Sequence, residues 1–371
     1  MKLLMPLLLL FVLVLPGTCP SPVRGDEDLS RHPIYSRYDF AKGPRVINFA
    51  SQPLAVPIGV ISEVMRRDRI LRQELAKLGY EIRFLPFLKG NDINFFFKQG
   101  KIVAAMGGDM PTIMTAASLD IVVPALAKLG FSSIVASNIT TAADLKGKKI
   151  GYPPFSNGHY ALLSALSSVN LKETDVRLVP MDINKMVDAL AAKKIDAFAA
   201  WEPVPSIAAK TGDHFRTIFR CQNSSYFYLS RAFAERHPEA TSLMLAAMVR
   251  ALHWMKKDER NLRQASAWML DASGRLQGKP VGLTADEIAI LTRRDILDIT
   301  THPTIPELDL TDKGTVRRKF DFLKSQGIVP ASSAAEKVLR SFDRELISRV
   351  LTRHKKYRVE SFDYETERVD Q

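Results

Sequence analysis

The sequence predicts an α/β fold of two units, and three observations carry this prediction. The chain has 371 residues, which is two to three times the usual length of a single domain. Short apolar strands alternate with amphipathic helices, which is typical of a doubly wound, mostly parallel sheet. A second run of the same pattern begins near Ser137. With 46% hydrophobic and 25% charged residues, the composition excludes a mainly disordered chain, a collagen, a coiled coil and a disulfide scaffold.

The first unit contains three expected strands. They are Val46–Ala50, Glu81–Leu85 and Ile102–Met106. Apolar residues at helical spacing follow the first strand, from Ile58 to Gly79. Asp92 is expected to be the N-cap of the helix after the second strand.

The second unit repeats this order of strand and helix. The expected elements are the strands Lys149–Gly151, Val176–Pro180 and Ala197–Ala199 and the helices Gly158–Val169 and Asn184–Lys193. After a strand at Tyr226–Ser230 the apolar spacing is helical only. The C-terminal third is therefore expected to be helical.

The N-terminus is typical of a secretory signal peptide. A basic residue precedes the apolar run Leu3–Leu15, which is too short for a membrane span of about 20 residues. We expect residues 1–25 to be removed by a cut before Asp26, which leaves a periplasmic, or otherwise secreted, soluble chain. Lipidation at Cys19 is the alternative, although Pro16-Gly17-Thr18 is a poor lipidation motif.

The net charge of +12 is spread along the chain. There is no basic stripe or aromatic platform of the kind that nucleic-acid binding needs, so no nucleic-acid partner is expected. Residues 352–371 are polar and densely charged and lack an apolar period, which predicts a loosely ordered, flexible tail.

Loops between strand ends and helix starts are where open α/β sheets bind ligands. Three loops qualify, and they are Ala50–Pro53, Gly107–Thr112 and Pro154–His159. In the third, Ser156 and Asn157 carry hydrogen-bonding side chains, and Gly158 lets backbone N–H groups approach an anion at the start of a helix. An ordinary turn with a helix cap explains the same residues. The residues alone leave both interpretations open.

Four motifs occur in an order and spacing known from one protein family. They are Gly108-Asp109-Met110-Pro111, Ala143-Asp144-Leu145-Lys146-Gly147-Lys148, Ser156-Asn157-Gly158-His159 and Ala200-Trp201-Glu202-Pro203. Over residues 45–351 the chain resembles the nitrate/sulfonate/taurine-type solute-binding proteins of ABC importers and their thiamine-precursor-binding relatives.

The resemblance implies a two-lobed periplasmic-binding-protein fold of type II (a venus flytrap), with mostly parallel sheets flanked by helices. Lobe one would comprise residues 45–135 and 229–351, and lobe two residues 136–228. Strands near Ser133–Ser137 and Tyr226–Ser230 would form the hinge. The ligand would lie in the cleft between the lobes.

The resemblance also implies ligand contacts from both lobes. The residues expected to bind ligand are Ser51, Gln52, Asp109 and Met110 from lobe one and Ser156, Asn157, Gly158, His159, Trp201 and Glu202 from lobe two. Ser156, Asn157 and the Gly158 amide are expected to hold its acidic group. Met110 stands where sulfonate and taurine binders commonly carry Ser or Thr, which favours a ligand with some apolar surface over nitrate.

Several of these residues have an ordinary structural alternative. Asp109 could cap a helix that begins at Pro111. A cationic His159 at a helix start would oppose the helix dipole. Trp201 could fill core at a strand end, and Glu202 could lie solvated at the cleft rim.

The sequence contains no His-Glu-x-x-His, Gly-x-Ser-x-Gly, Rossmann or Walker motif and no metal-ligand cluster. We therefore expect a binding protein with no catalytic residue, cofactor or metal. Its expected function is delivery of a small organic anion or zwitterion, sulfonate- or taurine-like, by a monomer to a membrane ABC permease. The alternatives are a same-fold binder of a pyrimidine, thiamine precursor or aromatic acid, a ligand-sensing receptor, and a same-fold biosynthetic enzyme.

Overall fold

The computed structural model describes residues 28–40, 43, 45–298 and 303–366. The expected signal peptide and Cys19 lie outside these residues. No helix within the described ranges is both long enough and apolar enough to cross a membrane.

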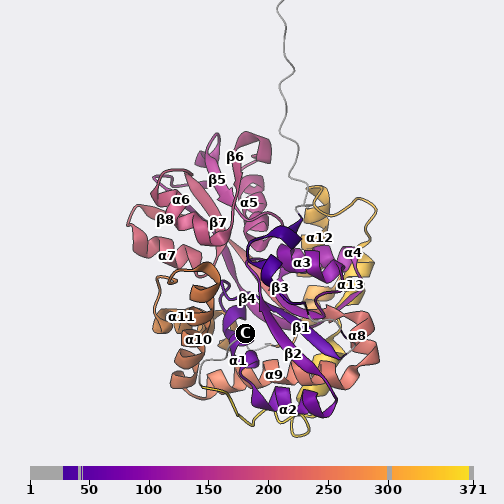
Figure 1. Ribbon diagram of the computed structural model, residues 1–371. Coiled ribbons are helices and arrows are strands. Elements are labelled where there is room, and N and C mark those ends of the chain that lie inside the picture. The colour runs from indigo at the N-terminus through magenta and orange to yellow at the C-terminus, as the bar shows by residue number, and fades with distance from the viewer. Residues whose placement is uncertain (1–27, 41–42, 44, 299–302, 367–371) are drawn as a thin grey trace, which may run out of the picture.

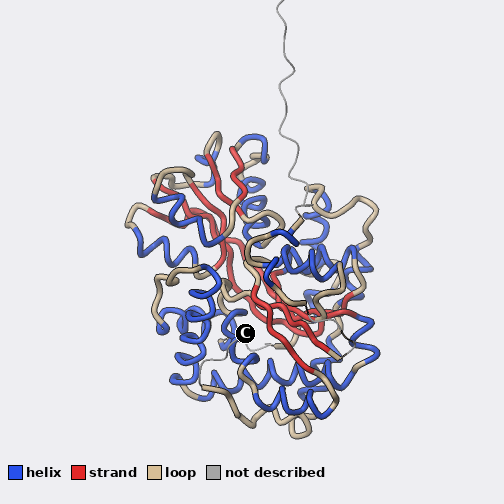
Figure 2. Tube along the Cα trace, in the orientation of Figure 1, coloured by secondary structure: helices blue, strands red, loops and turns tan. Residues whose placement is uncertain are grey.

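One eight-stranded sheet runs through the whole molecule (Figures 1 and 2). Its strands are β1 (Val46–Ser51), β2 (Glu81–Pro86), β3 (Ala104–Gly108), β4 (Ile121–Ser137), β5 (Lys149–Tyr152), β6 (Arg177–Pro180), β7 (Ala197–Trp201) and β8 (Phe215–Ser230). Their order across the sheet is β2-β1-β3-β8-β4-β7-β5-β6. The three strands at each end are parallel, and β8 and β4 join the two groups by antiparallel pairing.

Helices cover both faces of this sheet (Figure 1). They are α1 (Ile58–Arg66), α2 (Arg69–Lys77), α3 (Gly90–Lys98), α4 (Asp109–Ser118), α5 (Asn157–Ser168), α6 (Met186–Ala191), α7 (Val204–Thr211), α8 (Arg231–Arg236), α9 (Pro238–Lys257), α10 (Glu259–Gln277), α11 (Ala285–Thr292), α12 (Thr315–Ser325), α13 (Ala335–Ser341) and α14 (Arg344–Thr352). From the way the strands group in the sheet, we assign β1–β3 with α1–α4 and α8–α14 to lobe one and β5–β7 with α5–α7 to lobe two. The expected α/β fold with two lobes is confirmed.

The two long strands β4 and β8 pass from one lobe into the other. β8 pairs with β3 through Ser225–Leu229, and β4 pairs with β7 through Ser132–Ala136. The strands therefore cross between the lobes at residues 128–132 of β4 and 221–225 of β8, where Gly130 lies opposite Asn223. The hinge segments expected from the sequence lie on the same strands, on either side of this crossing.

Three local expectations differ from the structure. The helical pattern from Ile58 to Gly79 is two helices, because Asp68 accepts a hydrogen bond from Leu71 N (3.0 Å) and starts a new helix. Asp92 lies inside the first turn of α3 rather than at its N-cap, which is Lys89. Most of β4 was not expected as a strand, because an almost continuous apolar run carries no alternation.

Residues 353–366 also differ from the expected loose tail. Tyr357 and Val359 are buried, at 3% and 1% exposure. Glu365 N donates to Arg67 O (3.0 Å), and Tyr364 forms a β-bridge with Asp68. Scattered aromatic and branched side chains thus anchor this segment to lobe one, although their spacing follows no helix or strand period.

A buried ion pair between Arg250 and Asp68 also anchors residues 353–366. Arg250 and Asp68 are 1% and 0% exposed, and Arg250 Nε donates to Asp68 Oδ2 (2.7 Å). Arg250 Nη1 also donates to the carbonyl oxygens of Tyr357 (2.9 Å) and Arg358 (3.2 Å). Burial raises the pKa of Asp68 even though the guanidinium opposes that shift.

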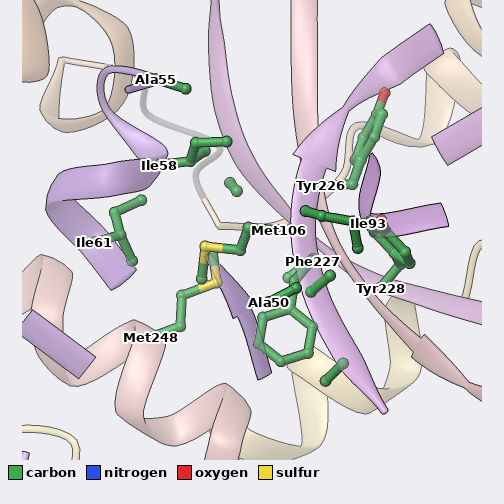
Figure 3. Close-up of a cluster of buried hydrophobic side chains, with 14 of the residues drawn as sticks. Ala50, Ala55, Ile58, Ile61, Ile93, Met106, Tyr226, Phe227, Tyr228 and Met248 are labelled. Carbon is green, nitrogen blue, oxygen red and sulfur yellow. The ribbon is translucent and has the colours of Figure 1, made fainter. Parts of the chain in front are cut away.

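The core of lobe one packs between the sheet and helices α1, α3 and α9. Figure 3 shows Ile58 and Ile61 of α1 on one side, Phe227 of β8 on the other, and Met106 and Met248 between them. A second, smaller core fills lobe two between β5, α5 and the outer half of β4. The larger cluster also continues into lobe two, where it includes Phe198 and Trp201 of β7, so the two lobes share part of their apolar packing.

The lobes are closed onto each other. Three ion pairs join them at the rim, and they are Lys89–Asp182 (3.3 Å), Lys210–Glu287 (3.0 Å) and Lys279–Asp188 (2.5 Å). Val56 N in lobe one also donates to Glu202 O in lobe two (3.0 Å). The exposed pairs Lys210–Glu287 and Lys279–Asp188 contribute about 0–1 kcal/mol each, whereas Lys89 and Asp182 are only 15% and 21% exposed.

One rim pair connects to a buried carboxylate. Tyr35 Oη donates to Asp92 Oδ2 (2.6 Å), and Lys89 Nζ lies 3.6 Å from Asp92 Oδ1. Asp92 is 2% exposed. Burial raises its pKa from 3.8 to about 6, and Lys89 and Tyr35 only partly oppose this shift.

We expect Arg250→Met to lower the free energy of unfolding by about 3–5 kcal/mol. The substitution leaves Asp68 buried without its partner and removes the donor that holds residues 353–366. Arg69→Met is the control, since Arg69 pairs with Asp363 (3.3 Å) at an exposed site and its loss should cost about 1 kcal/mol or less. Urea unfolding measures both, and equal losses would contradict this role of Arg250.

Asp92→Asn is expected to change how stability depends on pH. Because the folded protein keeps the Asp92 proton to a higher pH than the unfolded chain does, ionisation of Asp92 lowers stability as the pH rises from about 4 to about 6. The free energy of unfolding of the variant, minus that of the parent, should therefore rise by up to about 3 kcal/mol between pH 4 and pH 7. Urea unfolding at several pH values measures this difference. The exposed Asp321→Asn is the control, and a difference that is constant with pH would refute the prediction.

Candidate functional site

A narrow cavity of about 20 Å³ lies where the two lobes meet. Its apolar wall comes from lobe one and includes Ala55, Ile58 and Pro111. Ala55 and Ile58 are labelled in Figure 3, at the start of α1. Polar groups come from both lobes and from the crossing strands, and they belong to Gln52, Lys128, Ser156, Asn157, Trp201 and Ser225. An apolar wall with a few converging polar groups is typical of a small-molecule site.

The cavity contains one charged side chain, that of Lys128 on β4. Lys128 is 2% exposed, and its ammonium donates to Val56 O (3.2 Å). The pairing of β4 with β8 is irregular between Leu126 and Lys128. Such a bulge changes the direction in which a side chain points, and here Lys128 faces the cavity.

Sequence reasoning missed Lys128, although a signal was present. It is the one charged residue in the otherwise apolar run from Ile121 to Leu129. A lysine there must either be paired or have a function, because a buried ammonium is costly. Burial lowers its pKa, while Asp295, Glu202 and Asp109 at longer range raise it.

Trp201 stands at the end of β7 and also lines the cavity. It is 5% exposed, and its indole Nε1 is buried without a hydrogen-bond partner. Tryptophan N–H groups usually find an acceptor when they are buried. The sequence suggested that Trp201 is a stacking surface or fills core. The structure adds that its indole N–H is a hydrogen-bond donor without a partner.

The start of α5 places Ser156 and Asn157 on the cavity wall, as expected, but both side chains have protein partners. Ser156 Oγ donates to Pro153 O (2.6 Å) and accepts from His159 N (3.4 Å), which makes Ser156 the N-cap of α5. A Cβ on Gly158 would lie 2.8 Å from Ala199 O, so glycine is required there for packing against β7.

The Asn157 side chain joins the two lobes. Its Oδ1 accepts from Met110 N (3.2 Å), and its Nδ2 donates to Ser224 O (3.2 Å) at the strand crossing. A Cβ on Gly108 would lie 2.3 Å from Asn157 Oδ1. Glycine at position 108 therefore makes room for Asn157 when the lobes are closed.

Asp109 is buried beside the same strand crossing and is engaged by the protein. Its carboxylate pairs with Lys319 of α12 and accepts from Ser224 N (2.8 Å) and Met110 N (2.9 Å). Lys319 Nζ also donates to Gln222 O (3.3 Å). This arrangement favours a role for Asp109 in fixing the start of α4 to β8.

The other predicted ligand-binding residues divide into two groups. Gln52 lines the cavity, and its Nε2 donates to Met106 O (2.8 Å). Ser51, Met110 and Gly158 lie nearby but are not part of the wall.

His159 and Glu202 also lie outside the wall and have partners elsewhere. His159 Nε2 lies 3.1 Å from Glu173 Oε1. Glu202 Oε2 accepts from the hydroxyl of Ser206 (2.7 Å). The structure therefore brings four predicted residues to the cavity, and they are Gln52, Ser156, Asn157 and Trp201.

Comparison with known proteins gives partial sequence matches. Residues 122–261 match the family model described as NMT1/THI5 like. The chain is 25% identical over 219 residues to the taurine-binding periplasmic protein of Escherichia coli, covering 55% of this chain and 64% of that protein. It is 32% identical over 171 residues to an E. coli protein described as aliphatic sulfonates-binding, covering 42% and 52%. The chain spans about half the length of the curated relatives it matches.

Solved structures share the fold over most of the chain. The alkanesulfonate-binding protein SsuA of Xanthomonas axonopodis pv. citri, bound to MOPS, is 18% identical with a TM-score of 0.62, covering 81% of this chain and 99% of that one. The nitrate-binding protein NrtA of Synechocystis PCC 6803 is 12% identical with a TM-score of 0.64, covering 84% and 89%. The desulfurization enzyme DSZB is 16% identical with a TM-score of 0.54, covering 83% and 99%.

At these identities the structures show the fold alone, and this fold is shared by binding proteins and an enzyme. The sequence matches confirm the resemblance stated above. The chain is similar in sequence to taurine- and sulfonate-binding periplasmic proteins, residues 122–261 match the NMT1/THI5-like model, and the fold is the two-lobed fold of the solved structures.

Proposed function

We propose that this protein is an extracytoplasmic solute-binding protein that closes around a small organic anion and delivers it to a membrane ABC permease. The observation that carries the proposal is the cavity between the lobes, which has an apolar wall on one side and Lys128, Trp201 and the start of α5 around the rest. A lysine ammonium, an indole N–H and a helix N-terminus all favour negative charge. The relatives described as taurine- and sulfonate-binding support the same class of ligand.

The polar groups at the cavity favour binding rather than catalysis. A nucleophilic mechanism needs a hydroxyl or thiol in contact with a base. The Ser156 hydroxyl instead donates to a backbone carbonyl, and Cys221, on β8, is not part of the cavity wall. Among the described residues, no group of three or more His, Cys, Asp or Glu side chains could hold a metal ion. We therefore infer a carrier rather than an enzyme, and we propose that it acts as a monomer.

A ligand screen tests the proposal. We expect at least one of methanesulfonate, taurine, MOPS and benzoate to raise the melting temperature of the purified mature chain. A ligand present at 100 times its Kd adds about 2.7 kcal/mol to the free energy of unfolding. If none of these anions stabilises the protein, the proposed class of ligand is wrong.

Ligand binding should also bring the lobes together. Two of the rim ion pairs that join the closed arrangement are exposed and individually weak, so we expect the unliganded chain to populate an open form. Small-angle scattering should show a smaller radius of gyration with a stabilising anion than without it. The same radius in both states would count against closure.

Two neighbouring substitutions separate closure from helix capping. Asn157→Ala removes two hydrogen bonds that form between the lobes, so ligand affinity should fall by about tenfold while the melting temperature of the unliganded chain stays close to the parent value. Ser156→Ala removes a helix cap inside lobe two and should lower stability by about 1 kcal/mol. Calorimetric titration and thermal unfolding of both variants measure this. If Ser156→Ala has the larger effect on affinity, the start of α5 binds the ligand directly.

A further inference from the structure

We propose that the acidic group of the ligand binds between the Lys128 ammonium and the Trp201 indole N–H, at the strand crossing, rather than on the side chains of Ser156 and Asn157. This inference rests on the proposed function, because it places the ligand in the cavity between the lobes. It names the two donors that select an anionic group. It also names the class of ligand that fits the cavity, namely a sulfonate or carboxylate joined to a small apolar part.

The surroundings of Lys128 leave its charge without a contact partner. The ammonium has three N–H groups, and the structure gives it one acceptor, the carbonyl oxygen of Val56 (3.2 Å). Among the described residues, no carboxylate oxygen lies within 4 Å of it. Lys128 is 2% exposed and faces the cavity. An acceptor atom of a ligand in that cavity would therefore supply a hydrogen bond that the ammonium lacks.

Of the three carboxylates near Lys128, Asp109 and Glu202 are engaged by other groups, whereas Asp295 has one buried oxygen, Oδ2, without a hydrogen-bond partner. Asp109 pairs with Lys319. Asp295, on the π-helical turn Arg293–Leu297, accepts from Arg294 Nε (2.5 Å), and its other oxygen points at the position where Gly130 would carry a Cβ.

The third carboxylate is that of Glu202, which accepts from the hydroxyl and N–H of Ser206. These carboxylates stabilise the protonated form of Lys128 from a distance, but none of them occupies its contact position. An incoming anion meets a charged donor there, and the acid that competes with it most directly is Asp295, whose Oδ2 has no hydrogen-bond partner.

Trp201 provides the second donor from lobe two. Its Nε1 is buried, has no hydrogen-bond partner, and belongs to a side chain that lines the same cavity. Leaving a buried donor unpaired destabilises the protein. A ligand oxygen removes that cost only when lobe two has closed, because Trp201 moves with lobe two while Lys128 stays on the crossing strand.

The side chains expected from the sequence to hold the acidic group are less suited to it. Ser156 Oγ donates its one proton to Pro153 O, and Asn157 Nδ2 donates to Ser224 O. The apolar wall formed by Ala55, Ile58 and Pro111 lies on the lobe-one side, where it can contact the rest of the ligand. A bare oxyanion would leave that wall without contacts.

The test compares a charged probe with its neutral analogue. Methanesulfonate and methanesulfonamide are titrated into the parent chain and into Lys128→Met, Lys128→Arg and Trp201→Phe, with taurine and benzoate as further anionic probes. We expect Lys128→Met to weaken methanesulfonate binding at least tenfold and to change sulfonamide binding much less, since only the anion uses the charge. Trp201→Phe keeps an aromatic ring but loses the N–H, and it should weaken methanesulfonate binding by about tenfold.

Two controls separate a binding role from a structural one. Lys337 Nζ donates to the carbonyl oxygen of Ala117 (3.0 Å) away from the cavity, so Lys337→Met should leave methanesulfonate affinity within twofold of the parent value. Without ligand, Lys128→Met should melt at or above the temperature of the parent, because it removes a buried charge that has no ion-pair partner. A clearly lower melting temperature would indicate that Lys128 serves the fold, and the proposal would fail.

The outcomes also separate this inference from the proposed function. If the parent binds no anion, the proposed function itself fails. If the parent binds methanesulfonate and Lys128→Met binds it equally well, the function stands and the assignment of Lys128 is overturned. If Lys128→Arg retains the preference for sulfonate over sulfonamide while Lys128→Met loses it, the charge at this position is confirmed as the selective feature. Should benzoate alone show this dependence, the acidic group is a carboxylate.

Discussion

The antiparallel pairing of β4 with β8 is the constraint on which both lobes depend. These two strands pair along nearly their whole length, with one lobe's parallel strands attached on each side. Backbone hydrogen bonds of a sheet resist stretching but permit twist, so the pair can hold the lobes together while their relative orientation changes. The strands also determine what lies at the centre of the cleft. Lys128 and Ser225 are directly opposite each other at the crossing, and both line the cavity.

Buried charge is handled differently in the lobes and in the cleft. Inside lobe one, Arg250 contacts Asp68 and two carbonyl oxygens, and Lys319 contacts Asp109. Both pairs are complete, so they fix how segments distant in the sequence pack together. The cleft holds an ammonium without a contacting carboxylate and an indole N–H without an acceptor. These two unpaired donors lower the stability of the protein without ligand, and such a local cost is typical of a binding site.

The sequence predicted the fold well because the periodicity of its apolar residues is strong. The alternation from Val46 onward identified six of the strands closely, since parallel strands between helices have clear boundaries. β4 was harder to predict, because a strand that is buried over most of its length shows an apolar run rather than alternation. The tail was misjudged for a related reason, since Tyr357, Val359 and Tyr364 pack on lobe one without a regular spacing.

The candidate site could be predicted only in part. The loops with Gln52 and with Ser156 and Asn157 were identified from their position after strands, and Trp201 from the family resemblance. The structure brings these four residues to one cavity. Whether a polar side chain faces a ligand or a backbone partner depends on neighbours far away in the sequence. Asp109 illustrates this, because its partner Lys319 is 210 residues away. Lys128 stands out as the one charge in an apolar run, but the irregularity of β4 that turns it to the cavity follows from the pairing with β8 and not from the residue pattern.

The positions of Lys128 and Trp201 bear on how a ligand could drive closure. A ligand shifts the balance between open and closed forms only through contacts that differ between them. Lys128 lies on a crossing strand and Gln52 in lobe one, so both can meet a ligand while the cleft is open. Trp201 and the Asn157 bonds to Met110 N and Ser224 O belong to the closed form. Different residues therefore serve the initial capture of the ligand by a fixed charge and its later retention by lobe two. The rim ion pairs need favour the closed form only slightly.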